Sequence, residues 1–196
     1  MKNISVVVAS LALSSAYLVS DSSAEIVFSF SPTPNGAGTI ITADGDLDIR
    51  GLAQFGSHGI PQAVLDHDGD GDVFRSTPGL ADSYRIGGEV ALFNAPSEFH
   101  YSSNILDSSL VTGDEFGLTT GVDYLAIFVP RAFENGLISG QVTFIDAPLA
   151  SLRVIEQEFT WGAGFDQRAR IQVVPTPGVV LSIVAGASGL LCRRRR

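Results

Sequence analysis

The chain has 196 residues, of which 45% are hydrophobic and 17% charged, with a formal net charge of −9 and one cysteine. This length accommodates one ordinary domain with short appendages rather than two large domains. The acidic balance argues against a nucleic-acid partner, because binding of phosphates needs patches of lysine and arginine. A single cysteine excludes an internal disulfide framework and a cysteine-rich zinc site.

The charge is distributed unevenly along the chain. Residues 25–174 contain seven arginines and twenty acidic residues, a net charge of −13, and no lysine. The positive charge is concentrated at the two ends: Lys2 is the only lysine, and the last four residues are Arg193, Arg194, Arg195 and Arg196. This partition indicates that the two ends are not part of the folded domain.

The N-terminus has the layout of a secretory signal peptide. A short basic start is followed by an apolar stretch over residues 4–19. The small residues Ser22 and Ala24 then stand at the two positions that signal peptidase recognises. We expect signal peptidase to cut after Ala24, so that residues 1–24 are the signal peptide and Glu25 begins the mature protein. A retained anchor helix is the alternative. An exported protein without paired cysteines is stabilised by its core or by bound ions.

Residues 25–174 form the predicted domain, and their pattern is all-β. Turn pairs such as Asn35–Gly36 and Asn135–Gly136 separate short segments in which apolar and polar residues alternate. Residues 124–129 are apolar on both faces, which predicts a central strand. No segment keeps a 3.6-residue apolar period. The pattern predicts one β-sandwich or jelly-roll-like domain.

The sharpest local feature is a run of four alternating aspartates, namely Asp66, Asp68, Asp70 and Asp72. Carboxylates spaced in this way can converge on a hard cation such as Ca²⁺. The run is not an EF-hand, because the twelfth position is Thr77, where a bidentate Glu is needed, and helical flanks are missing. It predicts a weak Ca²⁺ site on a loop, with the four aspartates as ligands. A solvated acidic turn is the alternative.

A second alternating set consists of Asp44, Asp46 and Asp48. On a strand these three carboxylates share one face. They would contribute to the same cation site if their strand lay beside the 66–72 loop, and they would otherwise form a solvent-facing surface. The three histidines of the chain lack the spacing of a metal-ligand pair.

No catalytic motif occurs in the predicted domain, which contains no Gly-x-Ser-x-Gly elbow. A glycosidase uses two carboxylates, and twenty acidic residues give no basis for choosing a pair. Trp161, Phe159 and Tyr124 would form a stacking platform for carbohydrate if they were exposed together, and otherwise belong to the core. We expect a non-enzymatic protein. The alternative is a carbohydrate-binding module or a weak glycan hydrolase on a jelly-roll scaffold.

The C-terminal segment, residues 175–196, has the properties of a transient membrane stop. An apolar run over residues 179–192 precedes the arginines. As a helix it would span roughly 21 Å, whereas a bilayer core measures about 30 Å. Pro175 and Pro177 prevent its extension backwards, and the arginine cluster would hold its end in the cytoplasm. A simple tail anchor is the alternative.

This tail resembles the PEP-CTERM sorting signal of bacterial exosortase substrates, which consists of a Val-Pro-x-Pro motif, an apolar helix and a terminal arginine cluster. Thr176 stands where the family commonly has Glu. The resemblance implies recognition by an exosortase-type membrane peptidase near Pro175–Pro177 and transfer to the cell surface or extracellular matrix. The sorting residues would be Val174, Pro175, Thr176, Pro177, Gly178 and the four terminal arginines.

A looser resemblance covers residues 124–173. This region is similar to the last strands of a group of PEP-CTERM proteins that has no assigned activity, with the pattern strand, Pro, Gly-x-x-Thr-Phe, Ser-Leu and aromatic-Thr-Trp-Gly. It supports the β fold and implies no substrate.

Taken together, the sequence predicts an exported protein of the cell envelope, surface or matrix with a structural or adhesive role. The implied partners are signal peptidase and the export machinery, an exosortase-type peptidase and, transiently, the membrane. An extracellular polysaccharide is a further candidate partner, and Ca²⁺ is the candidate cofactor.

Overall fold

The computed structural model describes residues 24–60, 63–67, 71–76, 79–88, 90–94, 99–103, 110–121, 123–162 and 166–175. The predicted signal peptide, except for its last residue, lies outside these ranges, as does the predicted sorting tail from residue 176 onwards. Asp68 and Asp70 also lie outside them.

Within the described residues the chain forms thirteen strands and one short helix. The strands are β1 (Ala24–Pro32), β2 (Thr39–Asp48), β3 (Gln54–Ile60), β4 (Ala63–His67), β5 (Asp72–Arg75), β6 (Gly79–Gly87), β7 (Phe99–Ser103), β8 (Val111–Gly113), β9 (Gly117–Gly121), β10 (Tyr124–Pro130), β11 (Asn135–Phe144), β12 (Gln157–Trp161) and β13 (Gln167–Val173). The helix α1 (Leu149–Leu152) lies between β11 and β12 in the chain and buries Leu152.

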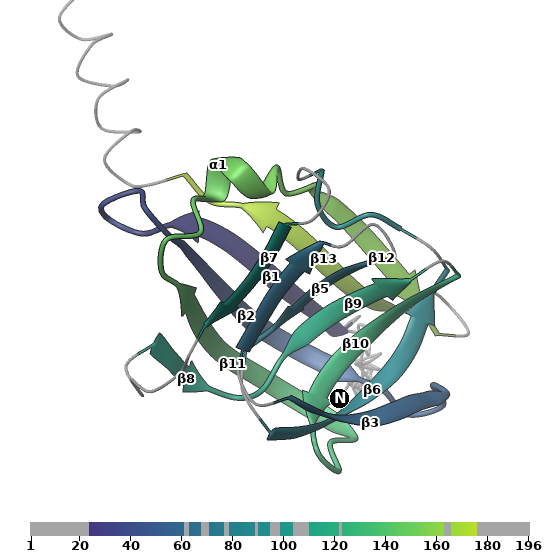
Figure 1. The fold of residues 1–196 in the computed structure, drawn as a ribbon. Helices are drawn as coiled ribbons and strands as arrows, with labels where there is room; N and C mark the ends of the chain where they lie inside the picture. The colour runs from purple at the N-terminus through teal and green to yellow at the C-terminus, as the bar shows by residue number, and fades with distance from the viewer. Residues whose placement is uncertain are drawn as a thin grey trace, which may run out of the picture.

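The strands form two sheets that pack face to face, as Figure 1 shows. The six-stranded sheet has the order β12-β13-β1-β2-β11-β8, and the seven-stranded sheet has the order β3-β6-β10-β9-β5-β4-β7. The predicted all-β sandwich is therefore confirmed. The pair β1–β13 is parallel, whereas the other strand pairs of the described part are antiparallel.

The space between the sheets is filled by aromatic rings. Phe28 and Phe30, on β1, contact Phe74 of the opposite sheet edge-on, with ring centroids 5.4 and 5.3 Å apart. All three side chains have no exposed surface. Burying each ring stabilises the fold by roughly 1.5–3 kcal/mol, and this core holds the sheets together without disulfides.

The burial of individual strands follows the predicted alternation. On β2, Leu47 is buried while Asp44 and Asp46 on the opposite face are exposed. The predicted central strand is β10, which lies between β6 and β9 and is buried on both faces over residues 125–129. The outer face of the seven-stranded sheet is therefore partly covered, and the part near Tyr124, at the start of β10, is more open.

Candidate functional site

The predicted cation loop connects β4 and β5, which form an antiparallel pair with His67 opposite Asp72. The hairpin places Asp66 and Asp72 on opposite faces of the sheet. Asp66 pairs with Val73 and shares the outer face with it, whereas Asp72 is on the inner face with Phe74. The other two predicted ligands, Asp68 and Asp70, lie outside the described residues.

Asp72 has a well-defined role in holding the chain together. It is 3% exposed, and one oxygen of its carboxylate accepts hydrogen bonds from the backbone N–H groups of Leu92 and Phe93. Its own N–H donates to the hydroxyl of Thr120 over 2.8 Å. Asp72 thus ties the 90–94 segment to the sheet. Among the described residues, no group of three or more metal-binding side chains lies together, and the Ca²⁺ site remains a prediction.

A hollow of about 210 Å³ lies beside this hairpin. It is lined by Asp66, Gly71, Asp72, Val73, Thr119, Thr120 and Tyr124. The lining combines carboxylate and hydroxyl groups with one aromatic ring. The hollow therefore joins two features singled out from the sequence, the acidic run and Tyr124.

The ring of Tyr124 forms a pair with Phe55, with centroids 4.5 Å apart and an interplanar angle of 32°. Phe55 is 44% exposed, an unusual exposure for a phenylalanine. It sits where β3 has a register shift between Gln54 and Gly56, and such bulges redirect a side chain. Phe55 could not be identified from the sequence, because nothing in its local pattern marks it as exposed.

The predicted aromatic platform is not assembled. Trp161 and Phe159 lie on β12 and are 6% and 9% exposed, as members of the core, so their interpretation as core residues is confirmed. Tyr124 lies in the other sheet, against Phe55. Phe55, paired with Tyr124, is thus the exposed aromatic ring among the residues whose side chains the structure describes, whereas Trp161 is buried.

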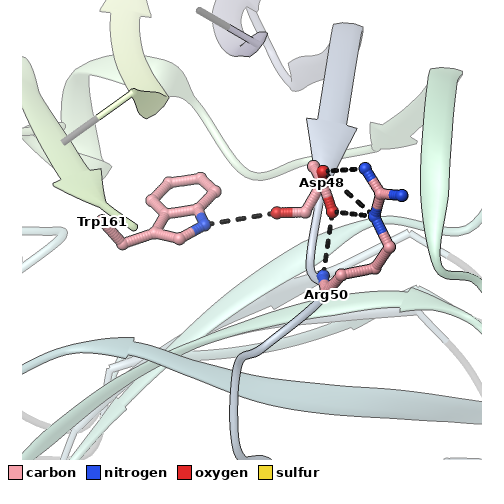
Figure 2. Close-up of polar contacts among 3 residues, drawn as sticks. All are labelled: Asp48, Arg50 and Trp161. Carbon is pink, nitrogen blue, oxygen red and sulfur yellow. Dashed lines mark hydrogen bonds and ion pairs between the residues drawn. The ribbon is translucent and has the colours of Figure 1, made fainter. Parts of the chain in front are cut away.

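Trp161 lies at one end of the six-stranded sheet, beside an ion pair (Figure 2). Its indole N–H donates to the backbone carbonyl of Asp48 over 3.4 Å. The Arg50 guanidinium donates to both oxygens of the Asp48 carboxylate, at 3.0 Å from Nε to Oδ1 and 2.6 Å from Nη2 to Oδ2. The side-chain hydrogen bond from Arg50 lowers the pKa of Asp48 below its ordinary value.

The second aspartate set, Asp44, Asp46 and Asp48, does not join the cation loop. These residues lie on β2, in the six-stranded sheet, whereas β4 and β5 lie in the seven-stranded sheet. Their side chains face away from the core between the sheets, since Ala43 and Leu47 occupy the buried face. The three aspartates therefore form a solvent-facing acidic surface on β2, which was the alternative to a shared cation site.

The end of the described chain is held at two points. The N–H of Val173 donates to the Glu156 carboxylate over 2.7 Å, and the N–H of Val174 donates to the Phe30 carbonyl over 2.8 Å. Pro175 has no N–H and cannot continue this ladder. The other predicted sorting residues, Thr176, Pro177, Gly178 and the four arginines, lie outside the described residues. Within the described part, no helix has the length and apolar character needed to cross a membrane.

Comparison with known proteins finds no matching family model, no similar curated protein and no similar solved structure.

Proposed function

We propose that the chain is an exported cell-surface or extracellular-matrix protein that is sorted by an exosortase-type system and has a non-enzymatic, structural or adhesive role. The observation that supports this proposal is the position at which the last strand ends. Strand β13 ends at Val173, one residue before the Val-Pro-x-Pro motif.

Both proposed cleavages would leave the sandwich intact. A cut after Ala24 removes a single residue from β1, the one paired with Gln167, and leaves the pairs from Glu25 to Phe30 in place. A cut beyond Pro175 leaves both hydrogen bonds that hold Val173 and Val174. A peptidase at the membrane would therefore act on a segment that starts directly where the fold ends.

The decisive experiment is mass spectrometry of the protein recovered from the surface or matrix of its native cells. We expect an N-terminus at Glu25 and loss of the segment that contains Arg193–Arg196. A mature form that retains Arg196 would contradict processing of the tail, and one that retains Met1 would contradict cleavage of the signal.

A variant with all four terminal arginines replaced by serine provides the test of sorting. We expect it to be exported without tail processing, because the positive cluster that halts the helix at the membrane is gone. The matched control is Leu137→Ala, which truncates an exposed side chain of β11 far from the arginine cluster in sequence. It should be processed like the unaltered protein.

A further inference from the structure

We infer that the open part of the outer face of the seven-stranded sheet binds a neutral polysaccharide. We call this part the Tyr124 surface and define it as Phe55, Asp66, Arg85, Thr119 and Tyr124. The inference rests on the proposed function, because it gives the adhesive role a ligand and a place on the molecule.

The register of the sheet puts the polar members of this surface in one row. Asp66 pairs with Val73, Val73 with Thr119, Thr119 with Ala126, and Ala126 with Arg85. Residues paired in this way project from the same face of a sheet. The row crosses four inter-strand spacings from β4 to β6, about 19 Å at about 4.8 Å each, which gives room for several sugar units.

The aromatic members lie beside this row. Tyr124 is two residues before Ala126 on β10 and so projects from the same face. Its ring extends over β9 at Gly121, where an added Cβ would lie only 2.3 Å from a ring carbon. Gly121 therefore makes the space that the ring occupies at the edge of the hollow. Phe55 extends the apolar surface from the other side of Tyr124.

This combination matches the chemistry of a sugar. The C–H groups on one side of a pyranose ring form an apolar patch that packs on an aromatic ring, while its hydroxyls exchange hydrogen bonds with planar or hydroxyl side chains. The Asp66 carboxylate can accept hydroxyl hydrogens, the Arg85 guanidinium can donate, and Thr119 can do both. The described residues that line the hollow itself offer carboxylates and no cationic side chain.

The charges select a neutral glycan over an anionic one. Asp66 lines the hollow from the outer face, and the Arg85 guanidinium donates to the backbone carbonyl of Asp123. Residues 25–174 as a whole carry a net charge of −13. A polyuronate or sulfated polymer would be repelled by the like charges of this protein, whereas a neutral polymer would not be repelled.

The test is affinity electrophoresis of the full-length protein in mild non-ionic detergent, through gels that contain soluble neutral polysaccharides (xylan, mixed-linkage β-glucan, galactomannan, dextran) or alginate as the anionic probe. We expect retardation by at least one neutral polymer and none by alginate. Phe55→Ala and Tyr124→Ala should each weaken the affinity about tenfold, since each removes part of a stacking surface. Tyr124→Phe should keep most of it.

Leu137→Ala is the matched control, because it truncates an exposed apolar side chain on the other sheet, and it should bind like the unaltered protein. Melting curves identify any variant that fails to fold. If Tyr124→Ala is unstable, Phe55→Ala still tests the surface, because Phe55 is exposed and its truncation leaves the core unchanged.

The inference is overturned if none of the neutral polymers retards the protein, if alginate alone does, or if Phe55→Ala and Leu137→Ala bind equally well. The masses of the mature termini are read independently of these gels, so failure of this inference is distinguishable from failure of the proposed sorting.

Discussion

Arg75 has the largest side chain that is fully buried among the described residues. It projects from β5 with 1% of its side chain exposed, and its Nε donates to the Glu115 carboxylate over 2.8 Å. Its guanidinium also lies over the Phe128 ring, 5.1 Å from the centroid. Removal of a charge from water costs several kcal/mol unless a partner compensates for it. The fold therefore depends on Glu115 in a way that no local sequence pattern indicates.

The first prediction concerns this buried pair. Glu115→Ala should lower the free energy of unfolding by about 3–5 kcal/mol, because it removes the carboxylate that the buried Arg75 guanidinium contacts at 2.5 Å. The measurement is urea unfolding followed by tryptophan fluorescence. The control is Glu158→Ala, which removes an exposed partner of Arg168 at 3.6 Å and should cost less than about 1 kcal/mol. Equal losses in the two variants would contradict the role of Glu115.

The second prediction concerns acid stability and Asp82. The hydrogen bond from the Ser57 hydroxyl at 2.6 Å, followed by the one from the Ala132 N–H at 3.1 Å, lowers the pKa of the Asp82 carboxyl below its ordinary value. A group whose pKa is lower in the folded state stabilises the fold above its unfolded pKa of about 3.9. That stabilisation is lost as the pH falls through the folded pKa.

Asp82→Asn should therefore be less stable than the unaltered protein at pH 6, and the difference should shrink as the pH is lowered below about 4. Urea midpoints measured at intervals across this range provide the check. If the difference between the two proteins were the same at every pH, the ionised carboxylate would not be the stabilising species.

At the scale of the elements, alternation predicted which residues of a strand are buried but not which strands are neighbours. The buried positions Ile26, Phe28 and Phe30 of β1 follow directly from their spacing. The parallel partner of β1 is β13, more than a hundred residues away in the chain. Spacing within one segment contains no information about such long-range pairing, so this part of the topology could not be predicted.

The same limit explains what was missed at the Tyr124 surface. In the sequence, the acidic run marks Asp66 and the aromatic side chain marks Tyr124. Thr119 and Arg85 share a row with Asp66 only through the register of five strands, and Phe55 is directed outward by a bulge. A change of register by one residue would turn each of these side chains to the other face.

The third prediction belongs to the β4–β5 hairpin and tests the predicted Ca²⁺ loop. A site of the affinity typical of extracellular modules would stabilise the protein by about 1–3 kcal/mol at about 10 mM Ca²⁺. We expect the melting temperature to rise with Ca²⁺ in a thermal scan. The double variant Asp68→Ala with Asp70→Ala should lose this response.

Asp44→Ala with Asp46→Ala is the matched control for the hairpin variant, because it removes two exposed carboxylates from β2 in the other sheet. This control should retain the response to Ca²⁺. A melting temperature that does not change at millimolar Ca²⁺ would exclude the site and leave the acidic run as a solvated turn.

At the scale of the whole molecule, the parallel β1–β13 pair separates the two ends of the domain. Ala24 lies opposite Gln167 and Phe30 opposite Val173, so the start of β1 and the end of β13 are about 20 Å apart along the strands, at about 3.3 Å per residue. If the domain were attached to the membrane through its C-terminal end, its N-terminus would lie at the opposite end of the β1–β13 pair. The arrangement suits a domain that is anchored at one end and processed at both.

The distribution of lysine gives a chemical test of the proposed mature form. Lys2 is the only lysine of the chain, so cleavage after Ala24 would leave the α-amino group of Glu25 as the sole primary amine. That group has a pKa near 7.7–8 and reacts at neutral pH. The mature protein should therefore take up one equivalent of an amine-specific ester, located on the peptide that begins with Glu25. The uncleaved chain has two amines, at Met1 and Lys2, and serves as the control. A second label, or a label on Lys2 in protein taken from the cell surface, would contradict removal of the signal peptide, and a single label on another N-terminal residue would move the cleavage site without changing the proposed route.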